Sequence, residues 1–301
     1  MTDRTAQTPL AAAPAPAQVG LAAVWMLGAI ASFSAMAIAG RAASLELDTF
    51  ELMTYRSAVG FVIVVTVGLL TGRIRQVTTR HMGRHVLRNI AHFTGQNLWF
   101  YAITVSPLAL VFALEFTSPL WTIGLAALFL GERLTRIKLL AGAMGFAGIL
   151  AIVQPGTAAI SPGMIAAASA AIMFATTAIF TKRLTATETI TCILFWLTLI
   201  QLGLGLVTSL YDGDMTLPSL AMLPWVVIIG VAGLAAHFCL TTALSLAPAS
   251  VVMPMDFARL PVIAVIGVLF YNEALSLGVI LGAILILTGN FLNIRAGRRA
   301  G

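Results

Sequence analysis

Apolar residues run in long unbroken stretches along most of the chain, and short polar segments join them. A helix needs about 20 apolar residues to cross the hydrocarbon core of a bilayer. Stretches of this length without amphipathic alternation are typical of helices in lipid. The pattern predicts ten membrane spans, at 20–40, 50–71, 87–105, 107–129, 137–154, 162–181, 189–210, 222–246, 249–270 and 276–295. The predicted fold class is therefore an all-α membrane protein with ten transmembrane helices, and the lipid bilayer is its main partner.

Two of the joins between spans are very short and contain a proline. Pro107 separates spans three and four, and Pro248 separates spans eight and nine. Proline lacks a backbone N–H and restrains the residue before it, which suits a tight hairpin between helices. We predict structural roles for both prolines.

Composition excludes an ordinary soluble domain. Of the 301 residues, 59% are hydrophobic and only 9% are charged, whereas soluble domains carry about 25% charged residues. The net charge of +6 does not indicate nucleic acid, because the basic residues lie in short loops, where they set topology.

The distribution of these basic residues predicts the orientation. With the N-terminus inside, the basic loops 73–88, 133–138 and 182–183 and the C-terminal arginines all fall on the cytoplasmic side. This pattern predicts a multi-pass protein of the cell inner (plasma) membrane with both termini cytoplasmic. Residues 1–19 lack the features of a cleavable signal and are predicted to be a disordered cytoplasmic tail. Residues 296–301 are predicted to form a basic cytoplasmic tail.

The two halves of the chain, 20–154 and 162–295, repeat each other. At a fixed shift of 141 residues Pro107 falls on Pro248, Glu132 on Glu273, Glu115 on Asp256 and Gln96 on His237. Each half has five predicted spans, and five is odd, so the second half enters the membrane upside down. Inverted repeats of this kind are common in secondary transporters, which bind substrate near the midplane between the halves.

Several segments carry a resemblance to a known family: "LGERLT" at 130–135, its echo "YNEALS" at 271–276, "FTSPLWT" at 116–122, "DFARLP" at 256–261 and "RNIAHFTGQNLWFYAI" at 88–103. With its ten spans in two halves, the chain resembles EamA-type members of the drug/metabolite transporter superfamily. The resemblance implies a two-repeat fold and alternating access through a central cavity lined mainly by helices 1, 3, 4, 6, 8 and 9.

Ionisable side chains within the predicted spans are the first candidates for function, because a charge near the bilayer centre costs at least about 2.5–3.5 kcal/mol. Asp256 and Arg259 lie three residues apart and can pair on one helix face, either as a structural pair or as a site for an anionic group. Glu115 has Ser118 at the position equivalent to Arg259. It therefore needs a partner on another helix, such as Arg56, or carries a proton, which makes Glu115 the candidate coupling residue.

Span three adds a polar face. Arg88, His92, Gln96 and Trp99 follow steps of three and four residues and share one side of a helix. The predicted cavity residues are His92, Gln96, Asn97, Trp99, Glu115, Trp121, His237, Asp256 and Arg259. Arg56, Glu132 and Glu273 are assigned structural roles, and each glutamate is expected to accept from free N–H groups that open the next helix.

No catalytic or metal motif appears at usable spacing. The sequence holds no HExxH, P-loop, Ser/His/Asp set or Cys/His metal cluster, and Cys192 and Cys239 are interpreted as packing residues. We therefore predict no catalytic residues, no metal, no cofactor and no enzyme activity. The predicted function is secondary active transport of a small polar or amphipathic metabolite with an anionic or zwitterionic group, coupled to protons or to exchange. An intramembrane enzyme using Glu115, Asp256 and His237 is the alternative, and the sequence leaves both a monomer and a homodimer open.

Overall fold

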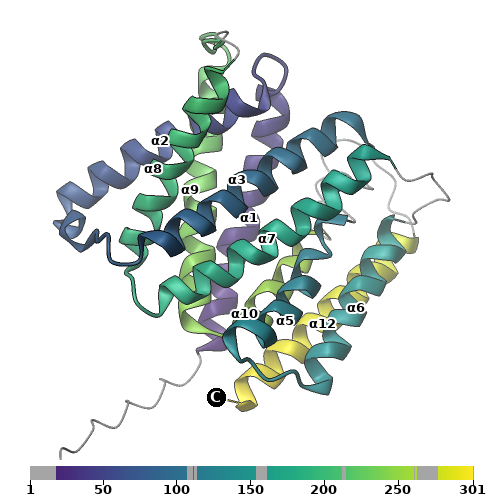
Figure 1. Ribbon diagram of the computed structural model, residues 1–301. Helices are drawn as coiled ribbons and strands as arrows, with labels where there is room; N and C mark the ends of the chain where they lie inside the picture. The colour runs from purple at the N-terminus through teal and green to yellow at the C-terminus, as the bar shows by residue number, and fades with distance from the viewer. Residues whose placement is uncertain are drawn as a thin grey trace, which may run out of the picture.

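The computed structural model describes residues 18–106, 111, 114–153, 161–211, 215–260, 262 and 277–300, and these residues form helices and short joins without a strand (Figure 1). The helices are α1 (Val19–Ala43), α2 (Thr49–Leu70), η1 (Arg73–Gln76), α3 (Met82–Val105), α5 (Ser118–Leu130), α6 (Arg136–Val153), α7 (Pro162–Thr185), α8 (Ile190–Ser209), α9 (Leu223–Leu246), α10 (Ala249–Val252), η2 (Met253–Ala258) and α12 (Leu277–Ala300).

Polar residues in the short joins start the helices. Asp48 accepts from the N–H of Glu51, and the Glu51 side chain accepts from the N–H of Asp48, so the pair forms a capping box before α2. Ser161 and Thr189 cap α7 and α8 through their hydroxyl groups. The apolar stretches thus become separate helices with defined starts.

The helices pack in pairs that follow the internal repeat. The 141-residue shift relates α1 to α7, α2 to α8, α3 to α9 and α6 to α12. In space α1 packs on α9 and α3 packs on α7, and these two contacts are equivalent under the repeat. Helices α2 and α8 pack together on one side of the molecule, and α6 and α12 lie side by side at the opposite edge (Figure 1). The all-α fold of two inverted five-helix repeats is confirmed.

Five of the described helices, α1, α2, α7, α8 and α9, are long and apolar enough to cross a membrane. Shorter apolar helices occur at Ser118–Leu130, Ala249–Ala258 and Ile280–Ala296. Helix α3 falls outside the apolar group although it packs among these helices, because it carries the polar face described above. The protein is a multi-pass membrane protein.

Spans four and nine are interrupted, which departs from the continuous helices expected there. A turn at Phe116 and Thr117 precedes α5, and the tighter helix η2 follows α10. Pro119 and Pro254 are the second residues of α5 and η2, in the first turn, where a missing N–H is tolerated. The interruptions bring irregular backbone next to Glu115 and Asp256, the acidic pair of the repeat. Broken helices of this kind are often found at transporter binding sites.

Glu132 connects the two halves. Its carboxylate accepts from the N–H groups of Ala249 at 2.8 Å and Ser250 at 3.1 Å, at the start of α10. The acceptor role was expected at the next helix, α6, but the free N–H groups that Glu132 reaches belong to the other repeat. Glu273 and Pro107 lie outside the described residues, while Pro248 directly precedes α10. Residues 296–300 are part of α12.

The join before α3 also contacts the second half. His81 Nδ1 lies 2.7 Å from Glu188 Oε1, and the Thr78 hydroxyl donates to Glu188 Oε2 at 2.9 Å. Burial tends to raise the pKa of Glu188, but the hydrogen bonds from His81 and Thr78 outweigh it and lower the pKa below its ordinary value. These contacts link the start of α3 to the start of α8.

Candidate functional site: a cavity between the two repeats

A central cavity lies between α1, α3, α7 and α9 and is closed on one side by the interrupted spans. The space available to the centres of water-sized molecules is about 120 Å³. A single water needs about 10–15 Å³ on this measure, so the cavity can hold a small organic molecule.

The two repeats line this cavity with equivalent positions. Sixteen of the 22 lining residues form eight pairs related by the 141-residue shift: Phe33 and Phe174, Met36 and Thr177, Ala37 and Ala178, Gln96 and His237, Trp99 and Leu240, Phe100 and Thr241, Glu115 and Asp256, and Ser118 and Arg259. The cavity therefore lies where the repeats face each other.

One side of the cavity holds Glu115, Asp256, Arg259 and Trp99, named here the Arg259 cluster. Arg259 Nη2 contacts Glu115 Oε1 at 2.6 Å and Asp256 Oδ2 at 3.0 Å. The Trp99 indole N–H donates to Glu115 Oε2 at 2.7 Å. One guanidinium thus serves two carboxylates, and with all three groups ionised the cluster carries one net negative charge.

Glu115 finds its partners in Arg259 and Trp99, not in Arg56 as considered from the sequence. The same guanidinium nitrogen, Arg259 Nη2, bonds to both Glu115 and Asp256, so an arginine present only in the second half pairs with acids of both halves. Among the described residues, Asp256 Oδ1 and Arg259 Nε have no hydrogen-bond partner. The cluster keeps one acceptor and one donor available.

Arg56 and Arg88, named here the arginine pair, are differently placed. Arg88 lines the cavity and donates to the Thr181 hydroxyl at 3.1 Å, and Arg56 donates to Gln96 Oε1 at 2.7 Å from directly behind the wall. Both side chains are buried. Within the described part of the chain, no carboxylate oxygen lies within 4.0 Å of either guanidinium.

Two histidines lie in the same wall. The rings of His92 and His237 meet edge to face, with centroids 4.6 Å apart and planes at 86°. Phe33 contacts His237 and Phe174 contacts His92. All four imidazole nitrogens lack a hydrogen-bond partner among the described residues, so a ligand can bond to them.

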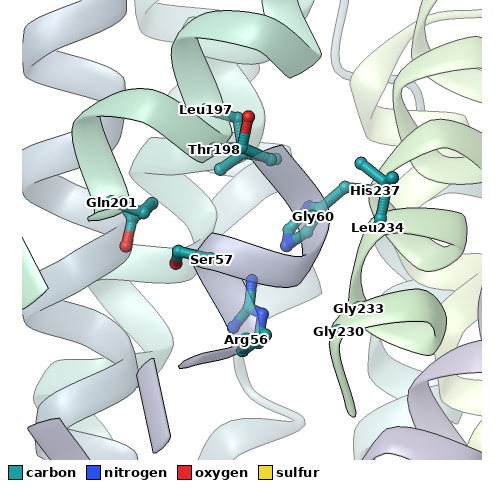
Figure 2. Close-up of a pocket in the computed structure, with 10 residues that line it drawn as sticks. All are labelled: Arg56, Ser57, Gly60, Leu197, Thr198, Gln201, Gly230, Gly233, Leu234 and His237. Atoms are coloured by element: carbon teal, nitrogen blue, oxygen red, sulfur yellow. The ribbon is translucent and has the colours of Figure 1, made fainter. Parts of the chain in front are cut away.

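A smaller pocket adjoins the cavity between α2, α8 and α9 (Figure 2). On the same measure its space is about 10 Å³, about enough for one water. Arg56 reaches this pocket from α2 and His237 reaches it from α9 (Figure 2). Gly233 leaves room for the guanidinium, because an added Cβ would lie 2.8 Å from Arg56 Nε.

Seven of the nine predicted cavity residues line the cavity: His92, Gln96, Trp99, Glu115, His237, Asp256 and Arg259. Asn97 is absent from the wall and donates to Phe93 O of its own helix at 2.8 Å. Trp121 lies on the outer side of α5 and is 48% exposed, where it faces the surroundings of the protein.

Sequence reasoning did not select the hydroxyl groups of Thr177, Thr181 and Thr241 or the arginine pair as cavity groups. The threonines had a usable signal, since Thr177 and Thr181 follow Phe174 at steps of three and four residues on one helix face. Arg56 was assigned a structural role, yet its hydrogen bond to the cavity residue Gln96 places it directly behind the cavity wall.

An inverted-repeat fold around a central cavity is typical of secondary membrane transporters. The profile of the EamA-like transporter family matches residues 20–154 and 161–295. The chain belongs to this family.

Curated relatives align over most of the chain. A riboflavin transporter of Brucella anthropi is 32% identical over 77% of this chain and 84% of the relative, and one of Rhizobium johnstonii is 29% identical over 96% and 95%. An S-adenosylmethionine uptake transporter of Rickettsia bellii is 24% identical over 92% of this chain and 94% of the relative. A solved crystal structure superimposes with a TM-score of 0.79 at 18% identity, covering 93% of this chain and 99% of that one, which supports the fold.

Proposed function

We propose that this protein is a secondary active transporter that carries a small heteroaromatic metabolite through its central cavity by alternating access. The observation that carries the proposal is the cavity wall, which the two repeats build from equivalent positions. Rocking two such halves about a shared site exposes it to each side of the membrane in turn.

The chemistry of the wall favours a flat ring with an anionic or acceptor-rich edge. Phe33, Phe174, Trp99 and Phe100 offer aromatic surface. The arginine pair has no carboxylate partner among the described residues, so a carboxylate or a row of carbonyl oxygens on the substrate can accept its hydrogen bonds. Riboflavin has such a ring and such an edge, and the relatives named for it support it as the first substrate to test.

The test is uptake by proteoliposomes that contain the purified protein, with riboflavin and S-adenosylmethionine as separate substrates. We expect saturable riboflavin uptake above that of protein-free liposomes, and inhibition by unlabelled riboflavin. Uptake of S-adenosylmethionine without uptake of riboflavin would show that the substrate resembles S-adenosylmethionine and not riboflavin. Chemical conversion of either compound by detergent-solubilised protein would instead favour the intramembrane enzyme.

We propose Glu115 as the coupling residue. Protonation of Glu115 would weaken its ion pair with Arg259 and release that guanidinium toward the substrate or Asp256. Glu115→Gln is then expected to abolish stimulation of uptake by an imposed pH gradient. Asp256→Asn, at the equivalent position of the other repeat, is the matched control and is expected to keep that stimulation.

We also propose that both termini are cytoplasmic and that the protein lies in the inner membrane. The basic loops support this orientation. A reporter that fluoresces only in the cytoplasm, fused to the C-terminus, is expected to be bright, and one that matures only outside the cytoplasm is expected to be inactive there.

A further inference from the structure

A second group of polar side chains lies away from the cavity, where the join before α3 meets the start of α8. It contains His85 on the first turn of α3, Glu188 in the join before α8 and Cys192 on the first turn of α8. One ligand atom from each of the three lies within 4.8 Å of the other two. His85 and Cys192 are fully buried, and the Glu188 side chain is only 3% exposed.

We propose that His85, Glu188 and Cys192 form a binding site for a borderline divalent cation of the Zn²⁺ class. Imidazole nitrogen, thiolate sulfur and carboxylate oxygen are the ligand types that zinc takes in proteins. One thiolate and one carboxylate supply two negative charges, which balance a divalent cation next to a neutral imidazole.

The distances suit such an ion. His85 Nε2 and Cys192 Sγ are 4.0 Å apart. A Zn–S bond of about 2.3 Å and a Zn–N bond of about 2.0–2.1 Å together exceed this separation, so one ion can reach both atoms. Three protein ligands leave a fourth position for water.

Neighbouring groups already orient two of the three candidate ligands, Glu188 and Cys192. His81 and the Thr78 hydroxyl hold the two carboxylate oxygens of Glu188. The Thr78 backbone N–H donates to Cys192 Sγ at 3.5 Å. In contrast, the His85 ring contacts Trp196 and the Cys192 sulfur, and its Nδ1 finds no hydrogen-bond partner among the described residues. Outer partners of this kind fix the ligands of metal sites.

The hydrogen bonds by themselves could serve only to tie the join to α8. A tie of that kind needs His81, Thr78 and Glu188, and it does not need a buried imidazole beside a buried thiol. A bound cation would explain why the His85 imidazole and the Cys192 thiol are buried next to each other. The ion would join α3 of the first repeat to α8 of the second, and its binding does not depend on the proposed transport function.

The test uses the full-length protein purified without a histidine tag, stripped with a chelator and then incubated with ZnCl₂. After desalting, we expect about one zinc per chain, which is the stoichiometry of a single mononuclear site, and a higher unfolding temperature. Co²⁺ in place of Zn²⁺ is expected to give a thiolate-to-metal charge-transfer band.

Cys192→Ser and Glu188→Gln are expected to lose the zinc and its stabilisation, while Cys239→Ser, which changes the other cysteine, keeps both. His81→Asn is expected to weaken binding by about 10–100-fold, as removal of outer partners does in known sites. Equal zinc retention by Cys192→Ser and wild type would overturn the proposal. So would the absence of both bound zinc and thermal stabilisation in the wild type, a measurement that remains decisive even if a variant does not fold.

Discussion

The Arg259 cluster and the arginine pair lie at the same cavity but differ in how their positive charges are compensated. Arg259 is held by two carboxylates, one of which also accepts from the Trp99 indole, whereas Arg56 and Arg88 bond only to uncharged groups among the described residues. A buried charge with a partner is already compensated, whereas a buried charge without one is costly until an anion pairs with it. The comparison assigns the Arg259 cluster to the conformational machinery and the arginine pair to substrate recognition.

The largest effect is expected from Arg259→Gln. It leaves Glu115 and Asp256 close together without a cation, and breaking a buried ion pair costs about 3–5 kcal/mol. We expect a clear fall in unfolding temperature in detergent and loss of transport. The triple variant that also carries Glu115→Gln and Asp256→Asn removes the stranded charges and should regain most of the stability. If Arg259→Gln alone were as stable as the wild type, the cluster would not be a structural element.

The next largest effect is expected from Arg56→Gln and Arg88→Gln. A hydrogen bond to a charged group contributes about 1.5–3 kcal/mol, so each change is expected to raise the substrate KM by roughly 10–150-fold. Because no described carboxylate loses a partner, the unfolding temperature should change little. Arg88→Lys keeps the charge and serves as the control. If stability falls as much as in Arg259→Gln, the contrast between the two groups is wrong.

A smaller effect is expected from Trp99→Phe, which keeps the aromatic surface but removes the donor to Glu115. Loss of this charge-assisted bond is worth about 1.5–3 kcal/mol at most, and water in the cavity can replace part of it. Transport should therefore fall several-fold and its dependence on a pH gradient should shift. Trp121→Phe, on the outer side of α5, is the matched control and should leave both unchanged.

The smallest effect is expected from Gly233→Ala. The added Cβ would press on Arg56 Nε, the end of a flexible side chain that can move. Overpacking costs about 1–3 kcal/mol in rigid surroundings, and less here, so a modest rise in KM with near-normal stability is expected. Gly203→Ala, where an added Cβ meets nothing within 4 Å, should behave as wild type. Identical KM values for the two variants would show that Arg56 does not contribute to substrate binding.

Much of the candidate site was predictable because it follows helix periodicity and the repeat. The steps from His92 to Gln96 and Trp99 place these residues on one face of α3, and the 141-residue shift pairs Gln96 with His237. Asn97 and Trp121 were not placed correctly, because polarity and aromaticity do not say which way a helix is rotated against its neighbours. The partner of Glu115 was also beyond reach, since Arg259 lies 144 residues away along the chain.

The sequence by itself determined the apolar helices, the inverted repeat and the family, because each depends on local hydropathy or on similarity at a fixed shift. Only the tertiary structure decided which charges meet. In the folded protein Arg259 pairs with both Glu115 and Asp256, and no described carboxylate pairs with the arginine pair. Spans four and nine are interrupted beside the acidic pair. It also brought His85 within 4.0 Å of Cys192, which is 107 residues further along the chain. Contacts between distant segments depend on how helices rotate and pack, and no local pattern encodes that rotation.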